Sequence, residues 1–514
     1  MKKVFIYIST CFCLCYLASC DKEIEETNAA YPALQPSKTD ADAGTWTTMI
    51  AASATDFPVP APQPTSSADY QQELQELKKA TQNLTSEQKR IINFWKAGSV
   101  LRWNEIMREL VAKHNLPPYQ NDDNTYPVPS AANPFAYPIF PFSNPPYAAR
   151  AYAYVSIAQY DALVMAHHFK TAFNRPAPYQ VDNAIQPMVP KSDLAAYPSE
   201  DAVIAGASIE MMKLLFPADL EYLKKMAEEE KNYRLWSGAN VKSDIAAGDS
   251  LGRWVARKII QRAKTDGMGA AGGNPALWTK LEDDCKAKGE TPWYSLETPK
   301  RPPMLPFFGN VKPILFGTDA VPSLRPGPPP SATSAEMKKE LDEVLNYTEN
   351  PTRERMRIVN FWADGVGTYT PPGHWNAIAT EDFVKKGYSE VRWARNYALL
   401  NASMMDAAIM CWNTKYHYFN ARPCQLNPKI KTLTGVPNFP AYISGHSTFS
   451  GAAATILGYL VPEKAAEYKT MALEASNSRM YGGIHYRSDC QAGLDTGGKI
   501  GDYAIARAKT DGAD

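Results

Sequence analysis

Three short stretches near the C-terminal end of the 514-residue chain decide its fold and its chemistry. They read KYHYFNARP at residues 415–423, FPAYISGH at 439–446 and SRMYGGIHYRSD at 478–489. Among their residues are three cationic side chains, a serine hydroxyl, a glycine amide and two imidazoles that could meet at one site. This set of groups is suited to binding a tetrahedral oxyanion and to moving protons on it.

The first stretch is expected on a helix, and the second directly before one. Lys415 and Arg422 are seven residues apart, so on a helix they share a face, and Pro423 then ends that helix. The triplet 444–446, Ser-Gly-His, precedes an apolar run at 449–460 that predicts a buried helix. The first turn of such a helix presents free backbone N–H groups, and a glycine there lets an anion approach closely.

The third stretch combines a clamp with an oriented imidazole. Arg479 can grip two oxygens with its planar guanidinium. His485 and Asp489 are four residues apart, so the carboxylate can hold the imidazole in one tautomer. A single histidine is more often a core residue than a ligand. The three stretches in this order within 75 residues, however, favour one site.

The chain also contains an internal repeat. ARAYA at 149–153 returns as ARNYA at 394–398, and RAKTDG at 262–267 returns unchanged at 507–512, both 245 residues later. RIINFW at 90–95 returns as RIVNFW at 357–362. With mostly helical periodicity from residue 84 onward, the repeat predicts an all-α fold made of a tandem pair of helical bundles.

Domain bounds follow from the repeat and from composition. We expect a first helical bundle at 84–270, a Pro- and Gly-rich irregular crossover at 271–335, and a second, catalytic bundle at 336–514. Residues 21–83, rich in Ala, Pro, Ser and Thr, are expected to be a tether followed by loops.

The first copy repeats the cations of the site without its imidazoles. Lys170, Ser199, Arg234 and Asp244 stand opposite Lys415, Ser444, Arg479 and Asp489, and Arg175 echoes Arg422 after a two-residue gap. Opposite His485 stands Asn240, and opposite Gly445 and His446 stand Glu200 and Asp201. Carboxylates at an anion site are repulsive, so we interpret the first copy as a structural half.

The N-terminal sequence indicates export. Residues 1–20, MKKVFIYISTCFCLCYLASC, have two lysines before an apolar core, and LASC at 17–20 resembles a bacterial lipobox that would make Cys20 the lipidated residue. An ordinary signal peptide or a short anchor helix remains as the alternative. We therefore expect a lipoprotein tied to the cell envelope, attached to the membrane only through this anchor, because no later apolar run has membrane-spanning length.

Charge and cysteine content bound the function further. Lys and Arg number 54 and Asp and Glu number 54, and this zero net charge gives no sign of a nucleic-acid partner. After removal of the signal, Cys285, Cys411, Cys424 and Cys490 remain. Disulfides are permitted outside the cytosol, and buried free thiols are equally consistent with the sequence.

At this point the residues resemble a known family. The order K-x6-R-P, S-G-H and S-R-x5-H-x3-D resembles the signature of vanadium-dependent haloperoxidases and type-2 phosphatidic acid phosphatases. The family's usual proline before S-G-H is Ile443 here. The stretch from Trp362 to PPGHWN at 371–376 and the tandem helical design also resemble the haloperoxidases.

The resemblance implies a role for each site residue. His485 would ligate vanadium, with one vanadate per chain, and Asp489 would orient its ring. His446 would act as general acid–base, and Lys415 would also activate peroxide toward halide. The oxygens of the anion would be held by Lys415, Arg422, Ser444, the Gly445 amide and Arg479.

The resemblance also implies the substrates. Hydrogen peroxide, a halide and an organic acceptor would be the partners, and the oligomeric state stays open. Trp412 and Phe439 match positions that line the halide site in chloride-oxidising members. Phe439 stands where bromide-specific members carry a second histidine, so we expect an apolar halide pocket and activity not restricted to iodide.

Two other functions fit the same sequence. In a soluble acid phosphatase of the same superfamily, His485 would attack phosphorus and His446 would protonate the leaving oxygen. The duplicated length and the aromatic pair favour the peroxidase. In a non-catalytic binding lipoprotein, the three stretches would be scattered in space, which a structure tests directly.

Overall fold

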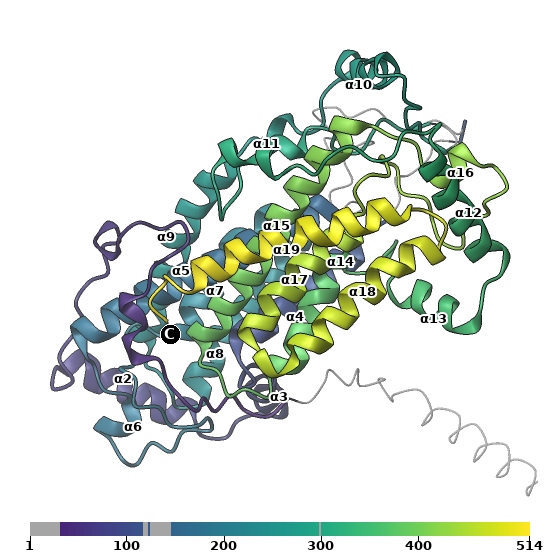
Figure 1. Ribbon diagram of the computed structural model, residues 1–514. Coiled ribbons are helices and arrows are strands. Elements are labelled where there is room, and N and C mark those ends of the chain that lie inside the picture. The colour runs from purple at the N-terminus through teal and green to yellow at the C-terminus, as the bar shows by residue number, and fades with distance from the viewer. Residues whose placement is uncertain (1–30, 117–121, 124–144, 298–299, 514) are drawn as a thin grey trace, which may run out of the picture. The chain divides into compact units, whose positions relative to one another are not determined.

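The computed structural model describes residues 31–116, 122–123, 145–297 and 300–513, and residues 33–514 form one compact unit (Figure 1). The fold is all-helical as predicted, and the described part contains no strand, only an isolated bridge between Pro292 and Asn420. The predicted signal peptide and Cys20 lie outside the described residues. No helix in the described ranges is both long and apolar enough to cross a bilayer.

Two sets of five helices share one pattern of lengths and spacings. Each helix of the second set begins 245 residues after its counterpart in the first. The first set is α5 (Pro145–Phe173), α6 (Pro178–Val181), α7 (Glu200–Leu215), α8 (Leu220–Trp236) and α9 (Lys242–Lys264). The second set is α15 (Glu390–Tyr418), α16 (Pro423–Leu426), α17 (Gly445–Leu460), α18 (Ala465–Tyr481) and α19 (Arg487–Ala508).

Glycines at matching positions bring the helices of each set together. A Cβ on Gly252 of α9 would lie 2.1 Å from the Val203 carbonyl oxygen of α7. The counterpart Gly497 of α19 would place a Cβ 2.2 Å from the carbonyl oxygen of Thr448 on α17. Only glycine permits these backbone contacts, so the same close helix pair recurs in both sets.

The long helices α5 and α15 are buried along most of their length and pack against each other (Figure 1). Asn401 of α15 donates to Ser156 of α5 at 2.9 Å across this contact. The matching residues Asp161 and Asp406 each accept backbone N–H groups from an entering loop, at 49–51 and at 314–315 respectively. The two halves therefore form one core rather than separate bundles.

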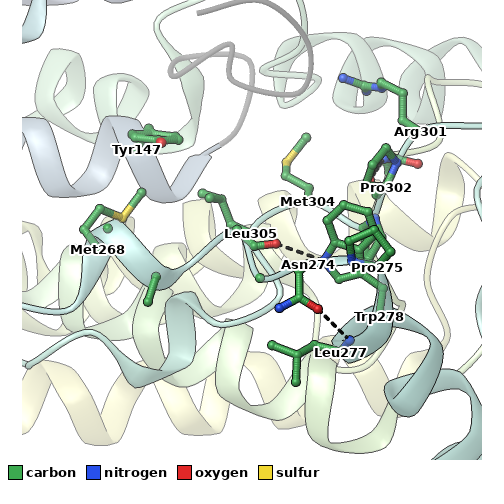
Figure 2. A pocket seen from close by; sticks show the side chains of 16 residues that line it. Tyr147, Met268, Asn274, Pro275, Leu277, Trp278, Arg301, Pro302, Met304 and Leu305 are labelled. Carbon is green, nitrogen blue, oxygen red and sulfur yellow. Dashed lines mark hydrogen bonds between the residues drawn. The ribbon is translucent and has the colours of Figure 1, made fainter. Parts of the chain in front are cut away.

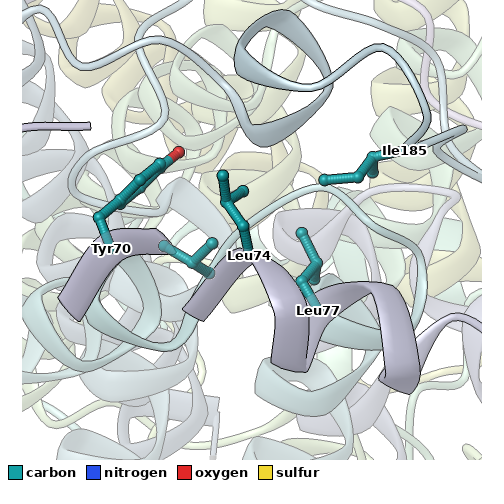
Figure 3. Close-up of a cluster of buried hydrophobic side chains, with 5 residues drawn as sticks. Tyr70, Leu74, Leu77 and Ile185 are labelled. Carbon is teal, nitrogen blue, oxygen red and sulfur yellow. The ribbon is translucent and has the colours of Figure 1, made fainter. Parts of the chain in front are cut away.

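The segment before residue 84 is not only tether and loops, so that prediction is wrong for its described part. Helix α2 (Ala68–Ala80) begins where the Ser67 hydroxyl accepts the Tyr70 N–H, and it buries Tyr70, Leu74 and Leu77 (Figure 3). These residues have i, i+4, i+7 spacing and pack against Ile185 and Val241 of the first half. The short 3-10 helices η1 (Ala41–Thr45) and η2 (Ala54–Asp56) precede it.

The crossover contains helical segments that were not predicted. It contains helix α10 (Pro275–Ala287), capped by Asn274, and the short turns η6 (Phe308–Asn310), η7 (Thr318–Ala320) and α11 (Val321–Leu324). Trp293 and Phe308 of this segment are buried. The Met304 carbonyl oxygen accepts both the Trp412 Nε1–H and the Tyr416 hydroxyl of α15. The crossover therefore forms one wall of the region around the C-terminal site.

The remaining helices flank the two sets. They are α3 (Ser86–Trp95), α4 (Ser99–His114), η4 (Pro217–Asp219), η5 (Met268–Ala270), α12 (Ala335–Glu349), α13 (Arg353–Phe361), α14 (Thr370–Phe383) and η8 (Pro462–Lys464). The loop between α13 and α14, residues 362–369, reaches the C-terminal site, as described below.

Candidate anion-binding active site

The residues singled out in the three C-terminal stretches meet around one cavity of about 370 Å³. The site residues of the three stretches come from α15, the turn between α15 and α16, the loop before α17, the first turn of α17, the end of α18 and the turn before α19. Helix α15 ends at Tyr418, so the prediction that Lys415 and Arg422 share one helix is wrong: Arg422 precedes the short helix α16, which Pro423 begins. The loop at 362–369 and the crossover also line the cavity. Its lining includes Trp412, Phe439, Gly445, His446, Arg479 and His485. Lys415, Arg422 and Ser444 lie directly behind this lining, fully buried.

His485 is held as a neutral imidazole with a lone pair available. Its Nδ1 lies 2.8 Å from Asp489 Oδ2, and that oxygen also accepts the Tyr486 N–H. With Nδ1–H donating to the carboxylate, Nε2 is the acceptor, and it receives Arg422 Nη1–H at 3.0 Å. Burial and the cations Arg422 and Lys415 lower the pKa of His485 well below its ordinary value.

Three buried cations surround this imidazole without carboxylate partners. Within the described residues, none of Lys415, Arg422 and Arg479 has a carboxylate oxygen within 4.0 Å. Lys415 Nζ donates to the carbonyl oxygens of Pro440 and Ala441, both at 2.8 Å. Burial lowers the pKa of Lys415 to about 7 and the pKa values of Arg422 and Arg479 to about 10. Buried charges need a counter-ion, so the site is built to receive an anion.

The first turn of α17 leaves room beside these cations. The Ser444 hydroxyl caps the helix by accepting the Ser447 N–H, and the Ser444 N–H donates to the Asp489 carbonyl oxygen at 3.0 Å. A Cβ on Gly445 would meet nothing closer than a Phe449 ring carbon at 4.0 Å. The glycine therefore opens the helix N-terminus toward the cavity, where the helix dipole favours negative charge.

His446 is paired with a carboxylate that sequence analysis missed. Its Nε2 lies 3.5 Å from Oδ2 of Asp364, whose other oxygen lies 3.0 Å from Nδ1 of His374. Burial and the Arg479 charge lower the pKa of His446 to about 4, against the opposing effect of Asp364. Burial alone would raise the pKa of Asp364, but the two imidazoles hold it well below its usual range. Asp364 and His374 come from the stretch that resembles the haloperoxidases, but nothing in the sequence paired them with His446.

Trp412 and Phe439 form an aromatic wall next to the cations. Their ring centroids are 4.9 Å apart, and both residues line the cavity. Lys415 Nζ and the Arg422 guanidinium lie 5.0 and 5.1 Å from the centre of the Phe439 ring. The cavity thus has one apolar, water-excluding side directly beside its positive charge.

The first half pairs its cations with its own carboxylates. Arg234 Nε lies 3.1 Å from Asp201, Lys170 lies 3.9 Å from Glu200, and Arg175 pairs with Asp244. Asn240, opposite His485, accepts Arg234 Nε–H at 2.9 Å through its amide oxygen. The cations of the first half are therefore neutralised by carboxylates, whereas Lys415, Arg422 and Arg479 have no carboxylate partner among the described residues.

The four cysteines carry free thiols. Cys285, Cys411 and Cys490 are buried, and Cys424 is partly buried. Of the two alternatives left open by the sequence, the structure has buried thiols and no disulfide among them. Cys411 donates weakly to the Ile443 carbonyl oxygen, and it stabilises the loop before Ser444 rather than the anion site.

Comparisons with known proteins find a family match in the second half and solved structures with a similar fold. The PAP2 superfamily model matches residues 396–506, and no curated protein matches the chain. A solved bacterial vanadium-dependent iodoperoxidase is 22% identical, covers 79% of this chain and 96% of its own, and has a TM-score of 0.59. A bacterial vanadium-dependent chloroperoxidase is 12% identical, covers 70% of this chain and 91% of its own, and has a TM-score of 0.51. Residues 396–506 therefore match the PAP2 superfamily, and the chain has the fold of the solved vanadium-dependent haloperoxidases.

Proposed function

We propose that the protein is a vanadate-dependent haloperoxidase that oxidises halide with hydrogen peroxide. The observation that carries the proposal is a set of three buried cations around the His485 imidazole that have no carboxylate partner among the described residues, beside the aromatic wall of Trp412 and Phe439. The net reaction consumes peroxide, halide and one proton and yields hypohalous acid and water.

The residues present fit vanadate. The described part of the chain has no group of three or more His, Cys, Asp or Glu side chains of the kind that holds a bare metal ion. Vanadate would instead be held as an oxyanion: Lys415, Arg422, Arg479 and the Gly445 amide would donate to its oxygens, and His485 would supply one nitrogen ligand. When bound, vanadate would supply the activation of peroxide.

The protein side of the mechanism follows from the hydrogen bonds. Asp489 keeps the proton of His485 on Nδ1, which leaves the Nε2 lone pair for the anion. Arg422, whose Nη1 donates to that lone pair in this structure, would turn the N–H to an oxygen of the anion. His446 is neutral above pH about 4 and can accept the proton of an incoming peroxide, and Asp364 then stabilises the imidazolium.

The aromatic wall of Trp412 and Phe439 would form one side of the halide-binding site. Trp412 and Phe439 are almost fully buried, and the Trp412 Nε1–H is already bonded to the Met304 carbonyl oxygen. An anion beside these rings loses water and remains close to the Lys415 charge. We propose that this apolar pocket takes halides other than iodide as well.

A soluble acid phosphatase is the second candidate, and one observation favours it too. The neutral His485, oriented by Asp489, is as suitable for attack on phosphorus as for binding vanadate. Purified protein should therefore be assayed for halide oxidation with peroxide, with and without vanadate, and for hydrolysis of a phosphate monoester. Vanadate-dependent halide oxidation supports the proposal. Phosphate release that vanadate inhibits, without halide oxidation, supports the phosphatase.

The non-catalytic alternative required the three stretches to be scattered. They instead share one cavity, so a binding role without chemistry loses its main sequence-based argument.

We also propose that the protein is exported and anchored through a lipid on Cys20. The support is the LASC sequence at 17–20. Incorporation of a labelled fatty acid into the wild type, and its loss in Cys20→Ala, would test this. Labelling that survives the substitution would contradict it.

A further inference from the structure

A second cavity, of about 720 Å³, adjoins the anion site. It lies between the end of the first half and the crossover, and Figure 2 shows Trp278, Pro275, Met304 and Leu305 around it. Arg301, Met304 and Asn438 line both cavities, so these three residues form the shared wall.

The second cavity offers a flat apolar surface. Trp278 is only partly buried, and its indole Nε1–H donates to the Gly272 carbonyl oxygen at 2.9 Å, which fixes the plane of the ring. A Cβ on Gly273 would lie 2.4 Å from the Phe307 ring and 3.1 Å from that indole nitrogen, so the glycine lets both rings lie against the backbone. With Pro275 and Leu277 beside it, this surface is suited to stacking an aromatic molecule.

The charge of the cavity indicates a neutral ligand. Among the described residues that line it, Arg301 is the one charged side chain, and its guanidinium is already bonded to both carboxylate oxygens of Glu297. A charged ligand would find no partner there, whereas a neutral one loses little on leaving water.

The shared wall carries one unpartnered acceptor. Asn438 is 5% exposed, and its Nδ2 donates to the Pro302 carbonyl oxygen at 2.7 Å, which fixes which end of the amide is oxygen. Its Oδ1 is buried and has no hydrogen-bond partner. An unsatisfied buried acceptor is costly. Because Oδ1 has almost no accessible surface in this structure, a ligand O–H or N–H would reach it through a turn of the Asn438 side chain toward the cavity.

We propose that the second cavity binds the organic acceptor, a neutral, electron-rich aromatic molecule that stacks on Trp278 and donates one O–H or N–H to Asn438 Oδ1. This inference rests on the proposed function, which supplies hypohalous acid from the neighbouring cavity. In the transfer, an aromatic C–H bond and the O–halogen bond break and a C–halogen bond forms. The hydroxide released takes the aromatic proton and leaves as water.

The test is a binding titration of the full chain without vanadate, peroxide or halide. The probes are 2-naphthol and 2-methoxynaphthalene, which differ in the donor, and binding is measured by calorimetry. We expect 2-naphthol to bind about 2- to 10-fold more tightly, the usual range for one hydrogen bond. Trp278→Ala should weaken binding of both probes about tenfold or more.

Two further variants complete the test. Asn438→Ala should remove the difference between the probes while retaining stacking. Tyr294→Ala, an exposed residue that lines neither cavity, should bind like the wild type. Equal affinity of the two probes for the wild type, or binding unaffected by Trp278→Ala, would overturn the assignment. Probe binding in a protein without halide oxidation would remove the proposed function but leave the aromatic site in place.

Discussion

Arg234 and Arg479 occupy equivalent places in the two halves, but their surroundings predict opposite consequences of removing them. Arg234 lies 3.1 Å from Asp201 and donates to Asn240, and despite burial its carboxylate neighbour holds its pKa above the usual range. Arg479 donates to the Ser478 hydroxyl and has no carboxylate within ion-pair distance in the described chain. The first arginine should therefore stabilise the fold, and the second should bind the anion.

The size of the first effect can be worked out. Breaking a buried ion pair from one side typically costs about 3–5 kcal/mol, because the other charge is left uncompensated. The entropy of unfolding is about 2 cal/mol/K per residue, which gives about 1 kcal/mol/K for the folded unit of residues 33–514. Arg234→Ala should therefore lower the melting temperature by about 3–5 °C, while halogenating activity per folded molecule stays near that of the wild type.

The matched variant Arg479→Ala should behave in the opposite way. Because burial lowers the pKa of Arg479 and no carboxylate compensates its charge, its removal should destabilise the vanadate-free protein less than Arg234→Ala does. Loss of charged hydrogen bonds worth about 1.5–3 kcal/mol should weaken vanadate binding about 10- to 100-fold. Calorimetric melting and vanadate titration of both variants are the assays. Equal loss of vanadate affinity in the two variants would refute the separation of roles.

Three further predictions concern the anion site. His485→Ala should abolish vanadate retention, because it removes the nitrogen ligand. His446→Ala should retain vanadate but turn over about a hundredfold more slowly or worse. Equal loss of metal in both variants would contradict the roles assigned to the two histidines. Phe439→His should change the halide preference or its pH profile, because it adds a titratable donor to the aromatic wall. An unchanged halide preference and pH profile would contradict the proposed halide pocket. Turnover of iodide alone by the wild type would contradict its breadth. Asp364→Asn should lower the pKa of His446 further, because the carboxylate stabilises the imidazolium. The acid limb of the pH–rate profile should therefore move to lower pH, and the maximum rate should fall. An acid limb at unchanged pH would mean that another group titrates there.

Much of the site could be predicted because its residues are local in sequence. His485 and Asp489 are one helical turn apart, and Ser444 and Gly445 begin a helix marked by its apolar run, so spacing alone predicted their geometry. Asp364 could not be found this way. It comes from the loop between α13 and α14, and only the packing of that loop brings it to His446.

The repeat allowed the role of the first half to be predicted, because the charges at its site positions decide whether an anion can bind there. Glu200 and Asp201 stand at the positions of Gly445 and His446, and they pair with Lys170 and Arg234. That the first half binds no vanadate is a prediction, which the metal content of vanadate-loaded protein tests.

The segments outside the repeat were harder to predict. Composition rich in Pro, Ser and Thr suggested loops before residue 84, but the spacing of Tyr70, Leu74 and Leu77 gives a helix that packs on the first half. The prolines of the crossover predicted irregular structure, so helix α10, which carries Trp278, was not predicted. The cavity beside the anion site depends on how that crossover folds, which no local pattern encodes.

Metal-free protein should be titrated with vanadate, and peroxide-dependent bromide oxidation measured at each step. Because the first half pairs its cations with its own carboxylates, we expect only the second half to bind vanadate and activity to rise to a plateau at one vanadate per chain. A plateau at two per chain would mean that the first half also binds vanadate, and a lack of vanadate-dependent oxidation would rule out the proposed haloperoxidase.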